Sequence, residues 1–119
     1  MKQELEAQMS EANKLFDAGD FKSARRLYFD LADKDPQSIK ILSGLGLTSM
    51  KMGLLEEAVG VFNRAVKLAP ALEGVSKGLF HSLWDLGRRV EALEEIKRFQ
   101  AISDSEDYRE IVREINEKW

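Results

Sequence analysis

The 119-residue chain offers few side chains for catalysis. It contains one histidine, His81, and no cysteine, and its serines have no base at a suitable place in the sequence. Lys77, His81 and Asp85 are spaced by four residues, which places them on one face of a helix. Such a row is far more often a set of surface ion pairs than a ligand set, and one imidazole with one carboxylate makes a poor metal site. We therefore expect no catalytic residue, no metal, no cofactor and no enzymatic activity.

Composition excludes other classes of function. Gly44 and Gly46 lie in a helical stretch without the lysine that a phosphate-binding loop needs. The net charge of -3 and the isoelectric point of about 5.3 are the reverse of a nucleic-acid-binding footprint. No window is apolar enough to span a membrane, the N-terminus does not resemble a signal peptide, and the lack of cysteine fits a reducing compartment. We expect no nucleic-acid or membrane partner and a cytoplasmic location.

The strongest feature of the sequence is a period of 34 residues, present in three copies. Residues of one type recur in register, as internal repeats of helical arrays do. The recurring sets are Gly19, Gly53 and Gly87; Ala24, Ala58 and Ala92; Tyr28, Phe62 and Ile96; and Pro36 and Pro70, with Asp104 in the third copy.

Each copy is predicted to be a pair of helices. Apolar residues between the glycines step by three and four positions, the helical period. The glycine suits the end of the first helix, because glycine enters the left-handed conformation without a steric penalty. Pro36 and Pro70 disfavour helical geometry before them, so the second helices should stop near Lys34 and Leu68. Small residues such as Ala58 should let neighbouring helices approach closely.

These residues resemble the tetratricopeptide repeat family, whose unit has 34 residues. The middle copy matches best, whereas the third has Phe80 at a small-residue position and Arg89 at the turn aromatic. The resemblance implies an all-α fold, an α-α superhelix of three helix-turn-helix repeats with a terminal capping helix, about seven helices in all. The repeats would cover about 5–38, 39–72 and 73–106, the capping helix about 107–119, and the whole of 1–119 would form a single domain.

The segment from Asp107 to Trp119 departs from the repeat. Its apolar residues form one stripe of an amphipathic helix, and Ser103, Asp104 or Ser105 could cap its start. A helix with a polar outer face would cover the exposed end of a repeat array. The alternative is a docking or dimerisation helix. The stripe consists of Tyr108, Ile111, Val112, Ile115 and Trp119.

The resemblance also implies a concave groove lined by the first helix of each unit. Phe16, Met50 and Trp84 occupy equivalent positions and could form a ladder along it, or pack against adjacent helices instead. Among the candidates, Leu47 is the hardest to explain as a core residue. Basic residues near the centre favour an apolar ligand with some acidic residues. The candidate partner-binding residues are Met9, Asn13, Phe16, Lys40, Ser43, Leu47, Met50, Lys51, Lys77, His81 and Trp84.

One specialised ligand of the family can be tested by position. Tetratricopeptide domains that hold the C-terminal carboxylate of heat-shock chaperones use lysine, asparagine and arginine side chains at five places. Here these positions carry Met9, Asn13, Gly44, Gly74 and Gly78. Only the asparagine is retained, so we expect no carboxylate clamp. The glycines either thin the helices for a partner backbone or allow two helices to pack closely.

The predicted function is a non-catalytic module that binds a peptide segment or protein partner in the groove. Because the chain is almost entirely repeats, its effect would come from occupancy, as a chaperone or as a neutralising, immunity-type protein. The alternative is a self-associating structural subunit of a larger assembly that uses the C-terminal helix. A monomer or weak homodimer is expected.

Overall fold

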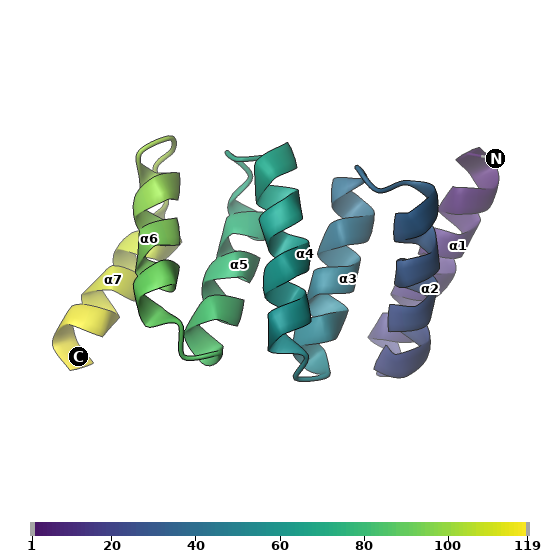
Figure 1. The fold of residues 1–119 in the computed structure, drawn as a ribbon, viewed down its shortest axis with the longest axis horizontal. Helices are drawn as coiled ribbons and strands as arrows, with labels where there is room; N and C mark the ends of the chain where they lie inside the picture. Colours follow the sequence, from purple (N-terminus) through teal and green to yellow (C-terminus); the bar gives the residue numbers. More distant parts are fainter. Residues whose placement is uncertain (1, 119) are drawn as a thin grey trace.

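The computed structural model describes residues 2–118, and this part of the chain folds into seven helices with no strand. Successive helices are antiparallel and stand in a row about 47 Å long, with α2, α4 and α6 forming one face (Figure 1). The predicted all-α helical-repeat architecture is confirmed. The helices are α1 (Lys2–Asp17), α2 (Phe21–Lys34), α3 (Ile39–Lys51), α4 (Leu55–Leu68), α5 (Glu73–Asp85), α6 (Arg89–Gln100) and α7 (Glu106–Lys118).

The helix ends follow local chemistry. Gly19, Gly53 and Gly87 have φ angles of 82°, 74° and 87°, so the predicted left-handed turn inside each helical pair is confirmed. The helices α2 and α4 end at Lys34 and Leu68, before the two prolines, as expected. At the start of α7, the Ser105 hydroxyl accepts a hydrogen bond of 3.1 Å from the Tyr108 amide, so Ser105 is the cap among the three candidates.

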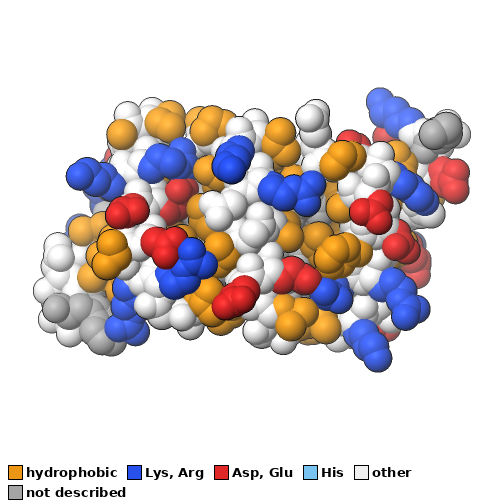
Figure 2. Space-filling view, in the orientation of Figure 1, with side chains coloured by type: hydrophobic (Ala, Val, Ile, Leu, Met, Phe, Trp, Pro, Cys, Tyr) orange, Lys and Arg blue, Asp and Glu red, His pale blue; other side chains and the backbone are white. Residues whose placement is uncertain are grey.

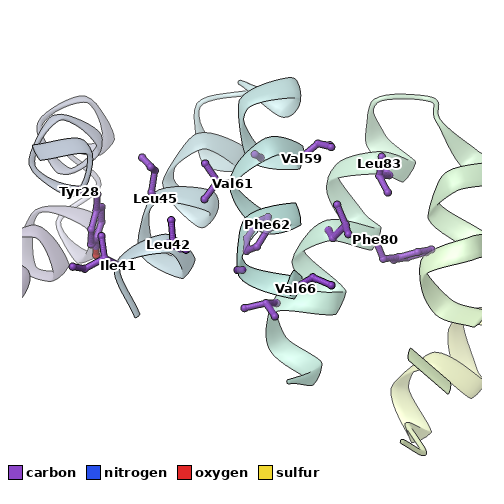
Figure 3. Packing of buried hydrophobic residues seen from close by; sticks show 14 of the residues in the cluster. Tyr28, Ile41, Leu42, Leu45, Val59, Val61, Phe62, Val66, Phe80 and Leu83 are labelled. Carbon is purple, nitrogen blue, oxygen red and sulfur yellow. The ribbon is translucent and has the colours of Figure 1, made fainter. Parts of the chain in front are cut away.

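Units pack through a large aromatic ring against glycine. The buried Phe62 of α4, labelled in Figure 3, lies against Gly46 of α3 and Gly78 of α5. A Cβ atom on either glycine would lie closer than 3.0 Å to the ring. Gly44 of α3 faces the ring of Tyr28 in the same way. Close packing therefore explains Gly44 and Gly78, whereas Gly74 faces open space.

In the third repeat, the large side chain between the paired helices lies on α5 instead of α6. Ile96 replaces the aromatic residue of α6, and the large Phe80 stands at the small-residue position of α5. Phe80 is buried, and its ring centroid lies 5.8 Å from that of Trp84 and 5.9 Å from that of Tyr108. This exchange accounts for Phe80 at the small-residue position, because the total volume between the helices must stay filled.

A polar bridge joins the first two units. Arg25 of α2 donates two hydrogen bonds, of 2.8 and 2.5 Å, to the carboxylate of Glu57 in α4, and Ser49 of α3 donates a third of 2.6 Å. Hydrogen bonding by the Arg25 guanidinium holds the pKa of Glu57 below its usual value. The bridge therefore stabilises the ionised carboxylate in the folded state.

A second polar network anchors α7. Tyr108 is fully buried, and its hydroxyl lies 2.7 Å from the Ser76 hydroxyl, which donates to Glu95 at 2.7 Å. Since serine has one hydroxyl proton, Tyr108 is the donor to Ser76. Arg98 donates two hydrogen bonds to Glu95. The stripe residues Ile111, Val112 and Ile115 are only partly buried against the core, and Trp119 lies outside the described residues.

Replacement of Gly78 by alanine should destabilise the protein. The added methyl group would overlap the buried Phe62 ring, and overpacking of this kind costs about 1–3 kcal/mol. Gly60→Ala is the matched control, because Gly60 lies within α4 and faces open space. This control should gain about 1 kcal/mol from helix propensity. Urea unfolding measures both, and a stabilised Gly78→Ala variant would contradict the packing.

The Arg25–Glu57 bridge should make the free energy of unfolding depend on pH in the acidic range. Because the folded-state pKa of Glu57 is lowered, its contribution is present at neutral pH and is lost as the pH falls through that lowered value. Glu57→Gln should lose about 1–2 kcal/mol at pH 7 and unfold with a shallower acid dependence than the wild type. The neighbouring Glu56→Gln, also the loss of one carboxylate, should retain the steeper dependence. The test is the urea midpoint of each variant between pH 3 and pH 7. An equal change of the midpoint with pH in the two variants would contradict the prediction.

Candidate functional site

A hollow lies between α1 and α3. Its volume is about 830 Å³, which falls within the usual range for ligand sites. Two facing helices and the loop before α5 supply its walls, and Tyr28 of α2 contributes to the lining. The lining residues are Glu6, Met9, Ser10, Asn13, Phe16, Tyr28, Ile39, Lys40, Ser43, Gly44, Leu47 and Leu72.

Candidate residues from two of the three units meet in this hollow. Leu47, the residue least explicable as core filler, is 46% exposed and lines it. Met50 is partly buried against the core, and Lys51 is exposed at the end of α3. Neither of these two lines the hollow. The candidates that do are Met9, Asn13, Phe16, Lys40, Ser43 and Leu47.

Two apolar lining residues were missing from the candidate set. Leu72 is 46% exposed and occupies the cap position of α5, where it makes no capping hydrogen bond. The equivalent position before α3 carries Ser38, which does cap its helix. A leucine in place of a capping residue was therefore a signal present in the sequence. Ile39, the first residue of α3, is partly buried and gave no such signal.

Six of the twelve lining residues of the hollow carry polar side chains, and two of these already bond to each other. The hydroxyl of Tyr28 donates a hydrogen bond to the side-chain oxygen of Asn13. Burial is the main cause that raises the pKa of Tyr28, so this hydroxyl remains a donor at neutral pH. Ser10 and Ser43 supply small hydroxyls, while Glu6 and Lys40 are the charged lining residues. The hollow thus combines apolar and polar side chains, with opposite charges on its two walls.

The candidates in the third unit lie beside α7 instead. Lys77 pairs with Asp107 of α7 at 2.5 Å and with Glu73 at 3.8 Å. His81 and Trp84 line a separate hollow of about 270 Å³. Its other lining residues are Phe80, Ile111, Glu114, Ile115 and Lys118. The charge of Lys77, one of the candidate groove residues, is therefore balanced by Asp107 of α7 and by Glu73.

The environments of His81 and Trp84 give no sign of catalysis. Partial burial by neighbouring side chains lowers the pKa of His81, with Asp85 acting in the opposite direction. The guanidinium of Arg89 lies 4.8 Å from the Trp84 ring centroid, a cation–π distance. Within residues 2–118, no group of three or more His, Cys, Asp or Glu side chains could hold a metal ion. No helix in this range is long and apolar enough to cross a membrane.

Comparison with known proteins identifies the fold through structure. No protein-family model matches the chain, and no curated protein matches it. Among solved structures, the first TPR of Spaghetti (RPAP3), bound to the HSP90 peptide SRMEEVD, matches with a TM-score of 0.85 at 18% identity. That match covers 98% of this chain and 94% of the other.

Two further structures have the same architecture. The Yersinia enterocolitica type III secretion chaperone SycD, in complex with a peptide of the translocator YopD, matches with a TM-score of 0.81 at 18% identity, covering 97% of this chain and 88% of SycD. MamA matches with a TM-score of 0.79 at 24% identity, over 87% of this chain and 56% of MamA. With three helical pairs, glycine-closed turns and these structural matches, the chain has the fold of the tetratricopeptide repeat family.

Proposed function

We propose that this chain is a non-catalytic binding module that holds a segment of a protein partner in the hollow between α1 and α3. Its effect would be exerted by occupancy, as a chaperone or a neutralising protein. The observation that carries the proposal is the pair of half-exposed leucines, Leu47 and Leu72, which line one hollow together with Phe16 and Met9. A ligand that buries them gains hydrophobic free energy in proportion to the apolar area covered.

The face formed by α2, α4 and α6 has a mixed surface, and a hollow of about 550 Å³ against α2 is lined mainly by charged and polar side chains. Figure 2 shows side chains of both charges scattered among apolar ones over α2, α4 and α6. Phe29, an exposed aromatic residue of α2, has the guanidinium of Arg25 over its ring at 4.9 Å. Such mixed surfaces are common on soluble domains and do not by themselves indicate a binding site.

The structural comparisons support binding of a peptide and help to define its kind. SycD and the RPAP3 domain were each solved with a bound peptide, and their folds match this one. The carboxylate-clamp positions of this chain hold no cation: Gly44 and Gly78 pack on aromatic rings, and Asn13 bonds to Tyr28. The proposed ligand is therefore not a chain terminus held by its carboxylate.

One observation favours self-association as a second function. Leu93 and Val90 of α6 are 41% and 72% exposed at the C-terminal end of the array. The equivalent of Leu93 one repeat earlier, Val59, is only 4% exposed. The last helical pair therefore retains apolar surface that a second copy could cover. The α7 stripe, itself partly buried, would border this contact.

The two functions are separable with matched variants. Leu47→Glu places a charge in the hollow, whereas Leu93→Glu places one at the end of the array, and both leucines are about equally exposed. Affinity capture from the native lysate, quantified by mass spectrometry, should recover a partner with wild type and with Leu93→Glu. Recovery should fall at least tenfold with Leu47→Glu.

Circular dichroism and thermal unfolding would first establish that both variants are folded. Equal recovery by all three proteins would contradict the assignment of the groove. Loss of recovery only with Leu93→Glu, together with a dimer in the wild type by size-exclusion mass measurement, would support the self-associating subunit instead.

A further inference from the structure

The chemistry of the groove defines the conformation of its ligand. We infer that the hollow between α1 and α3 takes an amphipathic α-helix of the partner rather than an extended peptide. This inference rests on the proposed function and specifies the ligand of the same site. It depends on three features of the hollow: its hydrogen-bonding groups, its shape and its charges.

Hydrogen bonding decides against an extended ligand. An extended backbone carries a donor and an acceptor at almost every residue, and burial without partners costs about 1–3 kcal/mol for each group. Beyond the first turn of each helix, the backbones of α1 and α3 are used within their own helices, so side chains would have to supply most of the partners. The polar side chains on these two walls are Glu6, Ser10, Asn13, Lys40 and Ser43, and the side-chain oxygen of Asn13 is already engaged by Tyr28. Five side chains are fewer than the roughly nine backbone groups that an extended segment presents along a span of about 15 Å. A helix satisfies its own backbone groups and avoids this cost.

The shape of the hollow suits a helix lying along α1 and α3. These two helices run in the same direction, each leading from one edge of the molecule to the other (Figure 1). The lining of α1 extends from Glu6 to Phe16, a span of about 15 Å at the helical rise, or about three turns. Two small residues, Ser10 and Ser43, line the hollow between the larger apolar side chains. They leave room for a third helix to approach.

The walls also define the faces of the bound helix. A helical ligand would meet Met9 and Phe16 on one wall and Leu47 with Leu72 on the other through apolar anchors spaced by three and four residues. Lys40 of α3 favours an acidic side chain on one flank of the ligand. Glu6 of α1 favours a basic side chain on the other flank.

Two matched display libraries would test the conformation. In one, the helix-facing positions i, i+3, i+4 and i+7 of a stable helical miniprotein are randomised. In the other, the same residue types are presented in linear peptides with proline at every fourth position, which prevents helix formation. Both are selected against the wild-type protein, and the dissociation constants of the enriched ligands are measured with wild type and with folded Leu47→Glu.

Ligands from the helical library are expected to bind Leu47→Glu at least tenfold more weakly than wild type. Ser43→Ala should change their affinity less than twofold, since a helical backbone needs no bond from that hydroxyl. Leu47-dependent ligands found only in the proline library, weakened tenfold by Ser43→Ala, would overturn the helical ligand while leaving groove binding intact. If neither library yields a Leu47-dependent ligand, both this inference and the proposed groove function fail.

The charge on the α3 wall of the hollow can be tested separately. Ligands of the helical library should carry an acidic residue on one flank, and Lys40→Glu should weaken them at least threefold. Replacement of that acidic residue by lysine in the ligand should restore binding to Lys40→Glu. The exposed Lys51→Glu, also in α3 but outside the hollow, is the matched control and should change affinity less than twofold. Equal effects of the two variants would show nonspecific charge attraction and overturn the flank assignment.

Discussion

The architecture depends on one contact, the Phe62 ring of α4 held between Gly46 of α3 and Gly78 of α5. A large ring can occupy the centre of the molecule only because neither neighbouring helix carries a side chain at the point of contact. The ring therefore determines how closely the second and third helical pairs approach. Tyr28 repeats the arrangement against Gly44 at the first junction. Its hydroxyl adds a hydrogen bond to Asn13, so a core residue also shapes the lining of the groove.

The two ends of the helical array differ in how their apolar surface is covered. At the third junction, the bulk of Phe80 replaces that of an aromatic residue in α6, and Tyr108 brings α7 against it. The Lys77–Asp107 pair then joins α7 to the face that the third unit would otherwise present to a ligand. In the first two units, the hollow between α1 and α3 remains open within residues 2–118. The apolar surface proposed for binding is thus confined to the first two units.

Local chemistry made most of the fold predictable. The 34-residue period, the turn glycines and the prolines after α2 and α4 act on neighbouring residues, and the helix ends they predict are those observed. The reason for Gly78 was not predictable, because the ring that it contacts lies on another helix. The site was predictable only in part for the same reason. The register of the repeat predicted that Leu47 would line the groove, and it does line the hollow, but it could not show that α7 would pair with Lys77 or that Leu72 would reach the hollow.

The central claim is that a partner occupies the space between α1 and α3. Methyl NMR spectra of the labelled protein, recorded before and after addition of a captured or selected partner, would test it most directly. The account predicts large shifts at Met9, Ile39, Leu47 and Leu72, with Val90, Leu93 and Ile102 unchanged. Shifts confined to the second group, or to Ile111 and Ile115 of α7, would contradict it and move the binding surface to the C-terminal end.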